Sequence, residues 1–444
     1  MNNSTDNSAS DTVNTAAPRK DSTSIVKRTL AKRYAAEKRF RFYGAAAIGI
    51  SLLFLAVLIG SIFLKGWPAF IETQVHIDVT YDTQTLGVEN GATSQELKTA
   101  NFYLLIKKTM RDMFPDVTER RERKELYKLI STDAEYQIRQ NLIDNPNQLG
   151  QSHSFWVLAD DELSALYKTG GLKDIANVTH TRLSDQQIAW THTLEEQGRL
   201  RKKFNATFFK NGDSREPEQA GIRAALIGSI LTLLITFVLS FPIAVATAIY
   251  LEEFAPQNRW TDLIEVNINN LAAVPSIVFG LLGLAVFINF FHLPRSAPVV
   301  GGIVLSLMTL PTIIISSRAA LKSVPPSIRE AGRGLGASRL QVVTHHVLPL
   351  AMPGILTGTI IGLAQALGET APLLMIGMVA FIVDIPSSVT DAATVLPVQV
   401  FLWADSPERA FLEKTSAAIL VLLVFLIVMN AAAVFLRKRF ERKW

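Results

Sequence analysis

The stretch from Arg318 to Pro349, RAALKSVPPSIREAGRGLGASRLQVVTHHVLP, lies between two apolar segments that are each long enough to cross a bilayer. Two short helices are predicted in it, because Ser327 with Glu330 and Ser338 with Gln341 have the spacing of capping boxes. Each predicted helix therefore begins at a serine whose side chain caps it.

Two glycines separate the predicted helices. Gly334 and Gly336 can adopt the left-handed backbone that commonly ends a helix. A helix, a glycine turn and a second helix at the membrane surface form an element that can dock into a groove of another protein. A soluble helix-turn-helix that binds DNA would have a similar pattern, but the position between two apolar spans argues against nucleic-acid binding.

Six residues of this stretch stand at a characteristic spacing, namely Glu330, Ala331, Gly332, Gly336, Leu348 and Pro349. In this pattern the stretch resembles the EAA loop in permease subunits of ATP-binding-cassette (ABC) importers. His346 departs from the pattern, since the family often has an apolar residue there. The resemblance implies a coupling helix that sits in a cleft of a cytoplasmic ATPase, and it implies that these six residues couple the permease to that ATPase.

Composition places much of the chain in lipid. Of its 444 residues 49% are hydrophobic, and the formal net charge is +5. Because the basic residues cluster beside apolar spans, they indicate membrane orientation. The sequence contains no cysteine, which excludes disulfides and thiol catalysis, and the scattered histidines imply no metal site.

The N-terminal part is predicted to be a membrane anchor. Residues 1–42 form a basic tail, and residues 43–67 contain a first transmembrane helix, roughly Tyr43 to Phe63, with Trp67 at the far interface. This apolar segment is too long for a typical signal peptide, and no small-residue cleavage site follows it. We therefore expect an uncleaved anchor with the N-terminus in the cytoplasm.

Residues 68–220 have the composition of a soluble α+β domain. Alternating apolar residues from Val75 to Tyr81 predict a half-buried strand, and 204–209 is a candidate second strand. Helices are expected at 96–114, 118–131, 132–144 and 184–203, the last two opening with capping boxes at Thr132 and Ser184. Asp160, Asp161 and Glu162 suit a helix N-terminus better than a cation site. No catalytic residue, metal site or cofactor site is indicated in this domain.

Five further spans are predicted, and they make the chain an all-α polytopic membrane protein of six transmembrane helices. They lie at about Ala224–Tyr250, Leu271–Phe291, Val299–Ser317, Gly354–Ile382 and Ala417–Leu436. The resemblance implies an importer permease domain at residues 222–436 with its coupling loop at 318–350, and residues 437–444 form a second basic tail. Because both ends and the coupling loop are basic, we expect N- and C-termini in the cytoplasm and residues 68–220 in the periplasm of a bacterial inner membrane.

Polar residues in the spans indicate a substrate pathway. Asn267 and Asn270 share a helix face, as do Gln365 and Glu369, and Thr370 follows them. An acid within an apolar helix is a candidate for function; the alternatives for Glu369 are a structural ion pair and a carboxyl near the outer headgroups. For the asparagines the alternative is interhelical hydrogen bonding.

Small residues at every fourth position from Gly354 to Thr370 form a ridge for close helix packing. The ridge suits a seam between two permease subunits and packing within this subunit equally well.

Three runs narrow the resemblance from importer permeases in general to one group of them. They are residues 267–283 (NINNLAAVPSIVFGLLG), Leu310-Pro311-Thr312, and ALGETAP from Ala366 to Pro372. In these runs the chain is similar to the phosphate-specific importer permeases of the PstA type, over roughly residues 222–436. Compact members of that family lack the domain at 68–220. The resemblance implies the type I ABC importer permease fold, and as partners a PstC-like second permease subunit, a PstB-like ATPase dimer, a PstS-like periplasmic phosphate-binding protein and membrane lipids.

The sequence therefore predicts a transporter subunit that imports inorganic phosphate, not an enzyme. It contains no G-x-x-x-x-G-K-[ST] phosphate loop, so ATP hydrolysis is expected in a separate subunit and no cofactor is expected in this one. Two alternatives stay open, an importer of another oxyanion such as molybdate or sulfate, and a membrane receptor whose outer domain senses a ligand.

Overall fold

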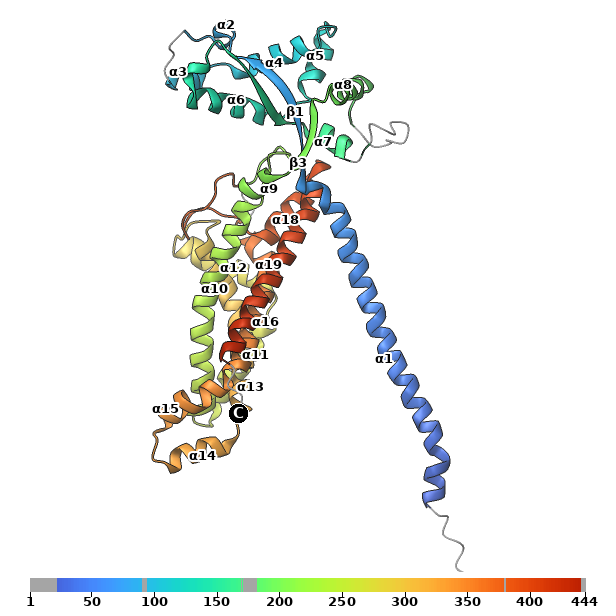
Figure 1. Ribbon diagram of the computed structural model, residues 1–444. Helices are drawn as coiled ribbons and strands as arrows, with labels where there is room; N and C mark the ends of the chain where they lie inside the picture. Colours follow the sequence, from blue (N-terminus) through green and yellow to red (C-terminus); the bar gives the residue numbers. More distant parts are fainter. Residues whose placement is uncertain (1–21, 90–93, 169, 171–181, 379–380, 441–444) are drawn as a thin grey trace, which may run out of the picture. The chain divides into compact units, whose positions relative to one another are not determined.

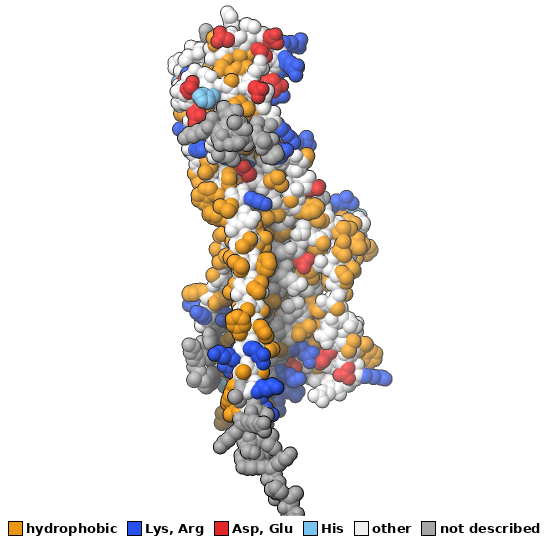
Figure 2. Space-filling model, turned by 90° about the vertical axis from the view of Figure 1, so that its right-hand side faces the viewer, with side chains coloured by type: hydrophobic (Ala, Val, Ile, Leu, Met, Phe, Trp, Pro, Cys, Tyr) orange, Lys and Arg blue, Asp and Glu red, His pale blue; other side chains and the backbone are white. Residues whose placement is uncertain are grey.

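Helix α1 (Ser22–Gly66) contains the predicted first span. The computed structural model describes residues 22–89, 94–168, 170, 182–378 and 381–440, and the chain divides into two units, residues 1–61 and 62–444. Figure 2 shows the apolar part of α1 as a column of hydrophobic side chains that ends in a group of basic ones. The predicted basic tails lie partly outside the described residues.

A three-stranded antiparallel sheet forms the centre of the domain that follows α1. Its strands are β1 (Ile71–Thr80), β2 (Ser152–Leu158) and β3 (Leu200–Phe204), in the order β2-β1-β3. In the register, Val75 stands opposite Val157 on one side and Leu200 on the other, and Ile71 stands opposite Phe204. The chain therefore enters and leaves this domain, which we call the outer domain after its predicted location, on neighbouring strands.

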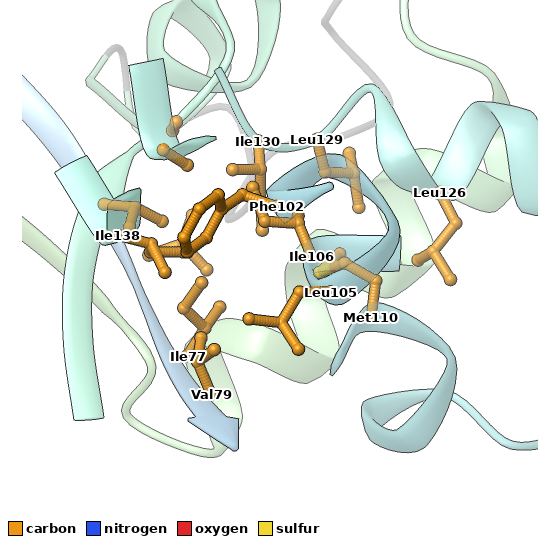
Figure 3. Close-up of a cluster of buried hydrophobic side chains, with 14 of the residues drawn as sticks. Ile77, Val79, Phe102, Leu105, Ile106, Met110, Leu126, Leu129, Ile130 and Ile138 are labelled. Atoms are coloured by element: carbon orange, nitrogen blue, oxygen red, sulfur yellow. The ribbon is translucent and has the colours of Figure 1, made fainter. Parts of the chain in front are cut away.

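Helices cover the sheet and enclose an apolar core (Figure 1), with α4 packed on β1 and α6 on β2. Ile77 and Val79 of β1 lie against Phe102, Leu105 and Met110 of α4, and all five side chains are almost fully buried (Figure 3). The helices of the domain are α2 (Thr83–Leu86), α3 (Ser94–Thr99), α4 (Phe102–Met113), α5 (Arg120–Tyr127), α6 (Asp133–Asp144), α7 (Asp161–Lys168), α8 (Asp185–Glu196) and α9 (Ala206–Lys210).

The structure confirms the predicted strand as β1 and shortens the predicted helices. The helix expected at 96–114 is broken, because the side chain of Asn101 accepts a hydrogen bond from the backbone N–H of Leu104 (3.1 Å) and starts α4 anew. Ser184 forms the expected capping box of α8, whereas Thr132 makes no capping hydrogen bond.

The second strand predicted at 204–209 is wrong. Residues 200–204 form β3, and Asn205 then caps α9 by accepting from the N–H of Phe208 (2.9 Å). An asparagine at that position favours a helix start over a continued strand. Strand β2 was not predicted.

Four long helices form the core of the membrane part: α10 (Arg223–Ile249), α13 (Pro298–Lys322), α16 (Leu348–Gly368) and α19 (Ala410–Phe440). Helix α13 packs against both α10 and α16, and α19 packs against α16 (Figure 1). With α1 they make five candidate spans among the described residues, or six if one bent helix pair counts as a span. The fold is that of a mostly helical, multi-pass membrane protein with a small sheet in its outer domain.

The span predicted at Leu271–Phe291 is broken. Helix α11 (Arg259–Ala272) is followed by α12 (Ser276–Leu282) and the π-helix η5 (Gly283–Phe290), with a bend of 101° between the two parts. The break falls at Pro275, which has no N–H to donate and disfavours helical backbone in the residue before it.

The span predicted at Gly354–Ile382 is too long. Helix α16 ends at Gly368, Glu369 has extended backbone, and the short helix α17 (Ala371–Met375) follows. Pro372 accounts for the ending, because it cannot donate to the carbonyl four residues before it. Glu369 therefore lies just past the helix and not inside it, contrary to the prediction.

A further buried helix was not predicted. Helix α18 (Leu396–Ala404) lies within the loop expected at the outer surface and packs against α10 and α19. Its side chains Leu396, Val398 and Trp403 are almost fully buried.

The glycine ridge of α16 packs within this subunit. A Cβ at Gly354 would lie 2.6 Å from the Cβ of Ala320, and one at Gly362 would lie 3.3 Å from Ile313. Both neighbours belong to α13, so these glycines allow α13 and α16 to approach closely. Of the two interpretations of the ridge, packing inside the subunit accounts for these glycines.

Candidate functional site

The predicted helix-turn-helix is present between α13 and α16. It consists of α14 (Pro326–Gly334), a turn, α15 (Arg339–Val342) and the π-helix η6 (Val343–Val347), which leads into α16. Gly336 has a φ of +83°, as expected of the residue that turns the chain. Ser338 and Gln341 form the predicted capping box of α15.

The cap predicted for α14 is wrong. The N-cap lies two residues earlier than predicted, at Pro325, so the helix begins at Pro326 and has no side-chain capping hydrogen bond. A proline is well suited to the first helical position, because its fixed φ matches the helix and its missing N–H would have no partner there. Gly334 belongs to α14 and not to the turn.

The six candidate coupling residues divide into exposed and inward-facing groups. Glu330, Ala331 and Gly336 are exposed, whereas Gly332 is buried, with a hypothetical Cβ 2.9 Å from Val342 of α15. Leu348 and Pro349 are half-buried in the first turn of α16.

The tip of the element presents apolar side chains to its surroundings, because Leu335 is 90% exposed and Leu340 is 61% exposed. The element thus has an inner side that packs against its neighbours and an outer side with exposed apolar side chains.

Two arginines join this element to the neighbouring helices. Arg329 of α14 donates from Nε and Nη2 to Glu253 Oε1, at 3.0 and 2.6 Å. Arg318, near the end of α13, donates to Glu265 of α11 (2.6 Å) and lies 3.7 Å from Glu252. Glu252 and Glu253 lie in the π-helix η4 (Tyr250–Phe254) that ends α10.

These pairs were missed by sequence reasoning. A sequence signal for them did exist. Glu252 and Glu253 are adjacent acids at the end of an apolar span, and their charge is opposite to that of the basic loop at residues 318–350.

The candidate pathway residues lie on two elements that both pack against α13. Asn267 and Asn270 are exposed on α11, and the Asn267 side chain donates to the carbonyl of Leu263 (2.8 Å). Gln365 is exposed near the end of α16, while Glu369 and Thr370 are half-buried beyond it. The structure thus groups the asparagines with each other and the last three residues with each other.

The two helix breaks are linked by close packing, which sequence reasoning did not foresee. A Cβ at Gly280 of α12 would lie 2.7 Å from the Cα of Pro372 in α17. Asn270 precedes the break before α12, and Glu369 with Thr370 occupies the break before α17. Non-helical backbone at membrane depth leaves polar groups free, and such backbone is tolerated where it lines a cavity or is buried in protein.

A second group of charged side chains lies where the outer domain meets α19. Lys168 of α7 lies 3.9 Å from Glu413, and Lys414 donates from Nζ to the carbonyl of Ala220 (2.5 Å). Burial raises the pKa of Glu72 and lowers that of Lys168. Together these residues line a small cavity with Asp161 and Glu218.

Two acids beside this junction also have raised pKa values. Burial, helped by Asp161 and Glu218, raises the pKa of Asp160 to about 8. Burial raises the pKa of Glu218 to about 7, although Ser131 donates to its carboxylate. Asp160 accepts from the backbone N–H of Glu162 (3.2 Å), which supports a helix-terminus role for this acidic run. Among the described residues no cluster of metal-binding side chains occurs.

Comparison with known proteins gives a curated relative over the membrane part. The phosphate transport system permease protein PstA 1 of Mycobacterium tuberculosis is 30% identical over 248 residues, which cover 56% of this chain and 75% of the relative. This chain belongs to the PstA-like family of ABC importer permeases. Membership favours the importer over the receptor hypothesis, and permeases of this family are transporter subunits and not enzymes.

Other comparisons agree with a PstA-like permease. Residues 240–444 match the family described as binding-protein-dependent transport system inner membrane component, and residues 27–177 match the domain of unknown function DUF3333. The probable ABC transporter permease protein YqgI of Bacillus subtilis is 36% identical over 155 residues, covering 35% of this chain and 52% of the relative.

Among solved structures, an inward-facing MetNI methionine ABC transporter covers 49% of this chain and 97% of the matched chain, at 18% identity and a TM-score of 0.40. The sequence matches and the apolar helices identify the PstA-like chain as a multi-pass importer permease with an α+β domain after its first span. A permease of this class works with a separate ATPase and a substrate-binding protein.

Proposed function

We propose that this chain is the permease subunit of an ATP-driven importer of inorganic phosphate. The observation that carries the proposal is the similarity to a phosphate transport system permease over three quarters of that relative's length. The chain's own residues fit an anion path, because amide groups and broken helices supply hydrogen-bond donors without a fixed charge.

In this proposal α14 and the turn after it form the coupling element. Glu330 and Ala331 face the ATPase from the exposed side of α14, and the apolar tip at Leu335 and Leu340 fills a groove on it. Gly332 and Gly336 shape the element, and Leu348 and Pro349 connect it to α16. ATPase closure then moves the element as a rigid body and alternates access to the pathway.

The substrate pathway runs past the two helix breaks. Asn267, Asn270 and Gln365 donate hydrogen bonds to the anion, and Thr370 donates from its hydroxyl. Glu369 accepts a hydrogen bond from a protonated phosphate oxygen. These roles follow from donor and acceptor chemistry at exposed or half-buried positions.

The proposed partners are a PstC-like second permease subunit, a PstB-like ATPase dimer and a PstS-like periplasmic phosphate-binding protein. The outer domain, residues 68–220, modulates docking of the binding protein. The basic ends and coupling loop orient the chain with both termini in the cytoplasm.

Uptake of radiolabelled phosphate tests the substrate. A deletion strain that lacks this chain should regain phosphate uptake when the chain is supplied, with sulfate and molybdate uptake as controls. If uptake of sulfate or molybdate were restored without phosphate uptake, that oxyanion and not phosphate would be the substrate.

Reporter fusions test the orientation. A reporter that is active only outside the cytoplasm should be active when fused at Gly150 and silent when fused at Gly334. The opposite pattern would contradict the proposed topology.

A further inference from the structure

The guanidinium of Arg329 is the hub of a buried hydrogen-bond network at the base of α14. Besides its hydrogen bonds to Glu253, it donates from Nη1 to the carbonyl of Val324 (2.6 Å) and from Nη2 to that of Leu321 (2.9 Å). One side chain thus ties α14 to the end of α10 and to the end of α13. The pair is shielded from water, since the side chains are 17% and 5% exposed.

The chemistry of arginine suits a rigid joint. A guanidinium is planar and always charged, and it can hold a carboxylate at two points while it donates to carbonyls at the same time. The two carbonyls lie at and just beyond the C-terminal end of α13, where carbonyls lack the regular helical partner four residues later. Ile328 adds an apolar contact to the neighbouring cluster, but an apolar contact has little directional preference.

The adjacent acid makes a separate link. Glu252 approaches Arg318 of α13, which also bonds to Glu265 of α11, while Glu253 turns toward Arg329. Consecutive acids of η4 therefore bind arginines on two different helices. The π-helix at the end of α10 is a departure from regular helix of the kind often found at functional sites.

We propose that the Glu253–Arg329 pair is the joint through which displacement of α14 moves α10 and α13, with Arg329 as a positioning residue. The inference rests on the proposed function, because motion passes from α14 to the membrane helices only if an ATPase displaces α14. Motion is transmitted between distant sites through packed and hydrogen-bonded elements that move together. Without the joint, α14 can shift while the membrane helices stay in place, so ATP is hydrolysed without transport.

The first test measures phosphate transported per ATP hydrolysed, with the assembled importer in liposomes. The variants are Glu253→Gln, which keeps an acceptor but removes the charge, Arg329→Gln, and Arg329→Lys, which keeps the charge but loses the planar fork. Lys322→Gln is the matched control, because Lys322 is an exposed cation at the end of α13. We expect the ratio to fall about tenfold in Arg329→Gln, less in Arg329→Lys, and not at all in the control.

The second test measures the joint without any substrate. Because the sequence contains no cysteine, Tyr250→Cys on η4 and Ser327→Cys on α14 provide unique sites for spin labels on exposed positions. The distance distribution between the labels should be narrow in the parent complex and should broaden in Glu253→Gln and Arg329→Gln. A merely structural role would lower the yield of complex without changing the ratio or the width in the complex that assembles.

An unchanged transport ratio in correctly assembled Glu253→Gln and Arg329→Gln complexes overturns the inference, as does an unchanged distance distribution. If the parent complex moves no phosphate, the proposed function fails, and the label distances still decide whether the joint exists.

Discussion

Glu369 stands where regular helix gives way to extended backbone at the end of α16. Its carboxylate would repel an anion unless the anion can donate a hydrogen bond. Phosphate near neutral pH carries at least one proton, whereas sulfate carries none. On the proposed pathway a carboxylate at this position would accept a hydrogen bond from phosphate and meet only repulsion from sulfate. Such a site rejects sulfate because its acceptor is left without a hydrogen-bond partner.

Glu369→Gln should reduce phosphate uptake and relax the exclusion of sulfate, because the amide keeps size and polarity but removes the charge. Uptake of both anions by the assembled importer measures this. Asp405→Asn, an exposed acid-to-amide change after α18, is the matched control and should leave both rates unchanged. Parent-like rate and selectivity in Glu369→Gln would assign Glu369 a structural role.

The sequence could identify candidate residues but not their surroundings. Glu369 was recognisable as an acid within an apolar stretch, yet its position beyond the helix depends on Pro372, four residues after Gly368, the last residue of α16. The partners of Arg329 could not be predicted, because Glu253 lies 76 positions earlier in the chain. Only the fold brings such charges together.

At the scale of elements, the turn between α14 and α15 depends on one backbone angle. Nothing lies within 4 Å of a Cβ built on Gly336, so space does not restrict this position, whereas its φ of +83° does. A β-branched side chain is strongly disfavoured at positive φ, and asparagine tolerates it better.

Gly336→Val should abolish uptake in protein that still inserts, while Gly336→Asn should retain most of it. The strain in the valine variant is on the order of 1–3 kcal/mol, enough to shift α14 relative to α15. Gly334→Ala is the control, since Gly334 is helical with open space around it. Uptake is measured against the amount of inserted protein, and normal uptake by Gly336→Val would contradict the role of the turn.

Element types were predictable where a local signal was sufficient. The capping boxes of α8 and α15 follow from side chains three residues apart, and both are present. The buried helix α18 and the broken span at Pro275 were missed, since hydrophobicity alone does not distinguish a straight span from a bent pair. Strand β2 was missed because its pairing with β1 is long-range.

At the scale of the molecule, the outer domain is attached through adjacent strands. Ile71 and Phe204 are register partners, so a short linker can join them when residues 72–203 are removed. Phe208 and Ala220, which pack with Trp403 and Phe411, would stay in place. The membrane part therefore keeps its outer cap without the sheet.

Replacement of residues 72–203 by a short glycine-serine linker should leave weaker but measurable phosphate uptake, because the role proposed for the domain is to modulate docking and not to conduct substrate. The variant also carries Glu413→Gln, since removal of Lys168 would leave that acid without its cation. Uptake at increasing concentrations of binding protein measures the docking defect. Complete loss in an assembled complex would contradict the modulating role.

Stability of the outer domain should fall as the pH rises from about 5 to about 8. The pKa of Asp160 is raised to about 8 and that of Glu218 to about 7, so the folded state binds more protons than the unfolded state in this range. By linkage, the free energy of unfolding then decreases with pH. Hydrogen exchange in β1 and α6 measures it, and the double variant Asp160→Asn with Glu218→Gln should flatten the dependence. A rise in stability over this range would refute the assignment.

The exposed tip of the coupling element has a consequence for the amounts in which the subunits are made. Leu335 presents an apolar side chain to water until a partner covers it. A copy made in excess of its partner therefore keeps an apolar side chain exposed, which is a feature of the partly unfolded chains that cellular proteases degrade. In the proposed importer, the lifetime of this subunit in the cell should therefore depend on the supply of its ATPase, and a leucine that docks into the ATPase would also signal that assembly is complete.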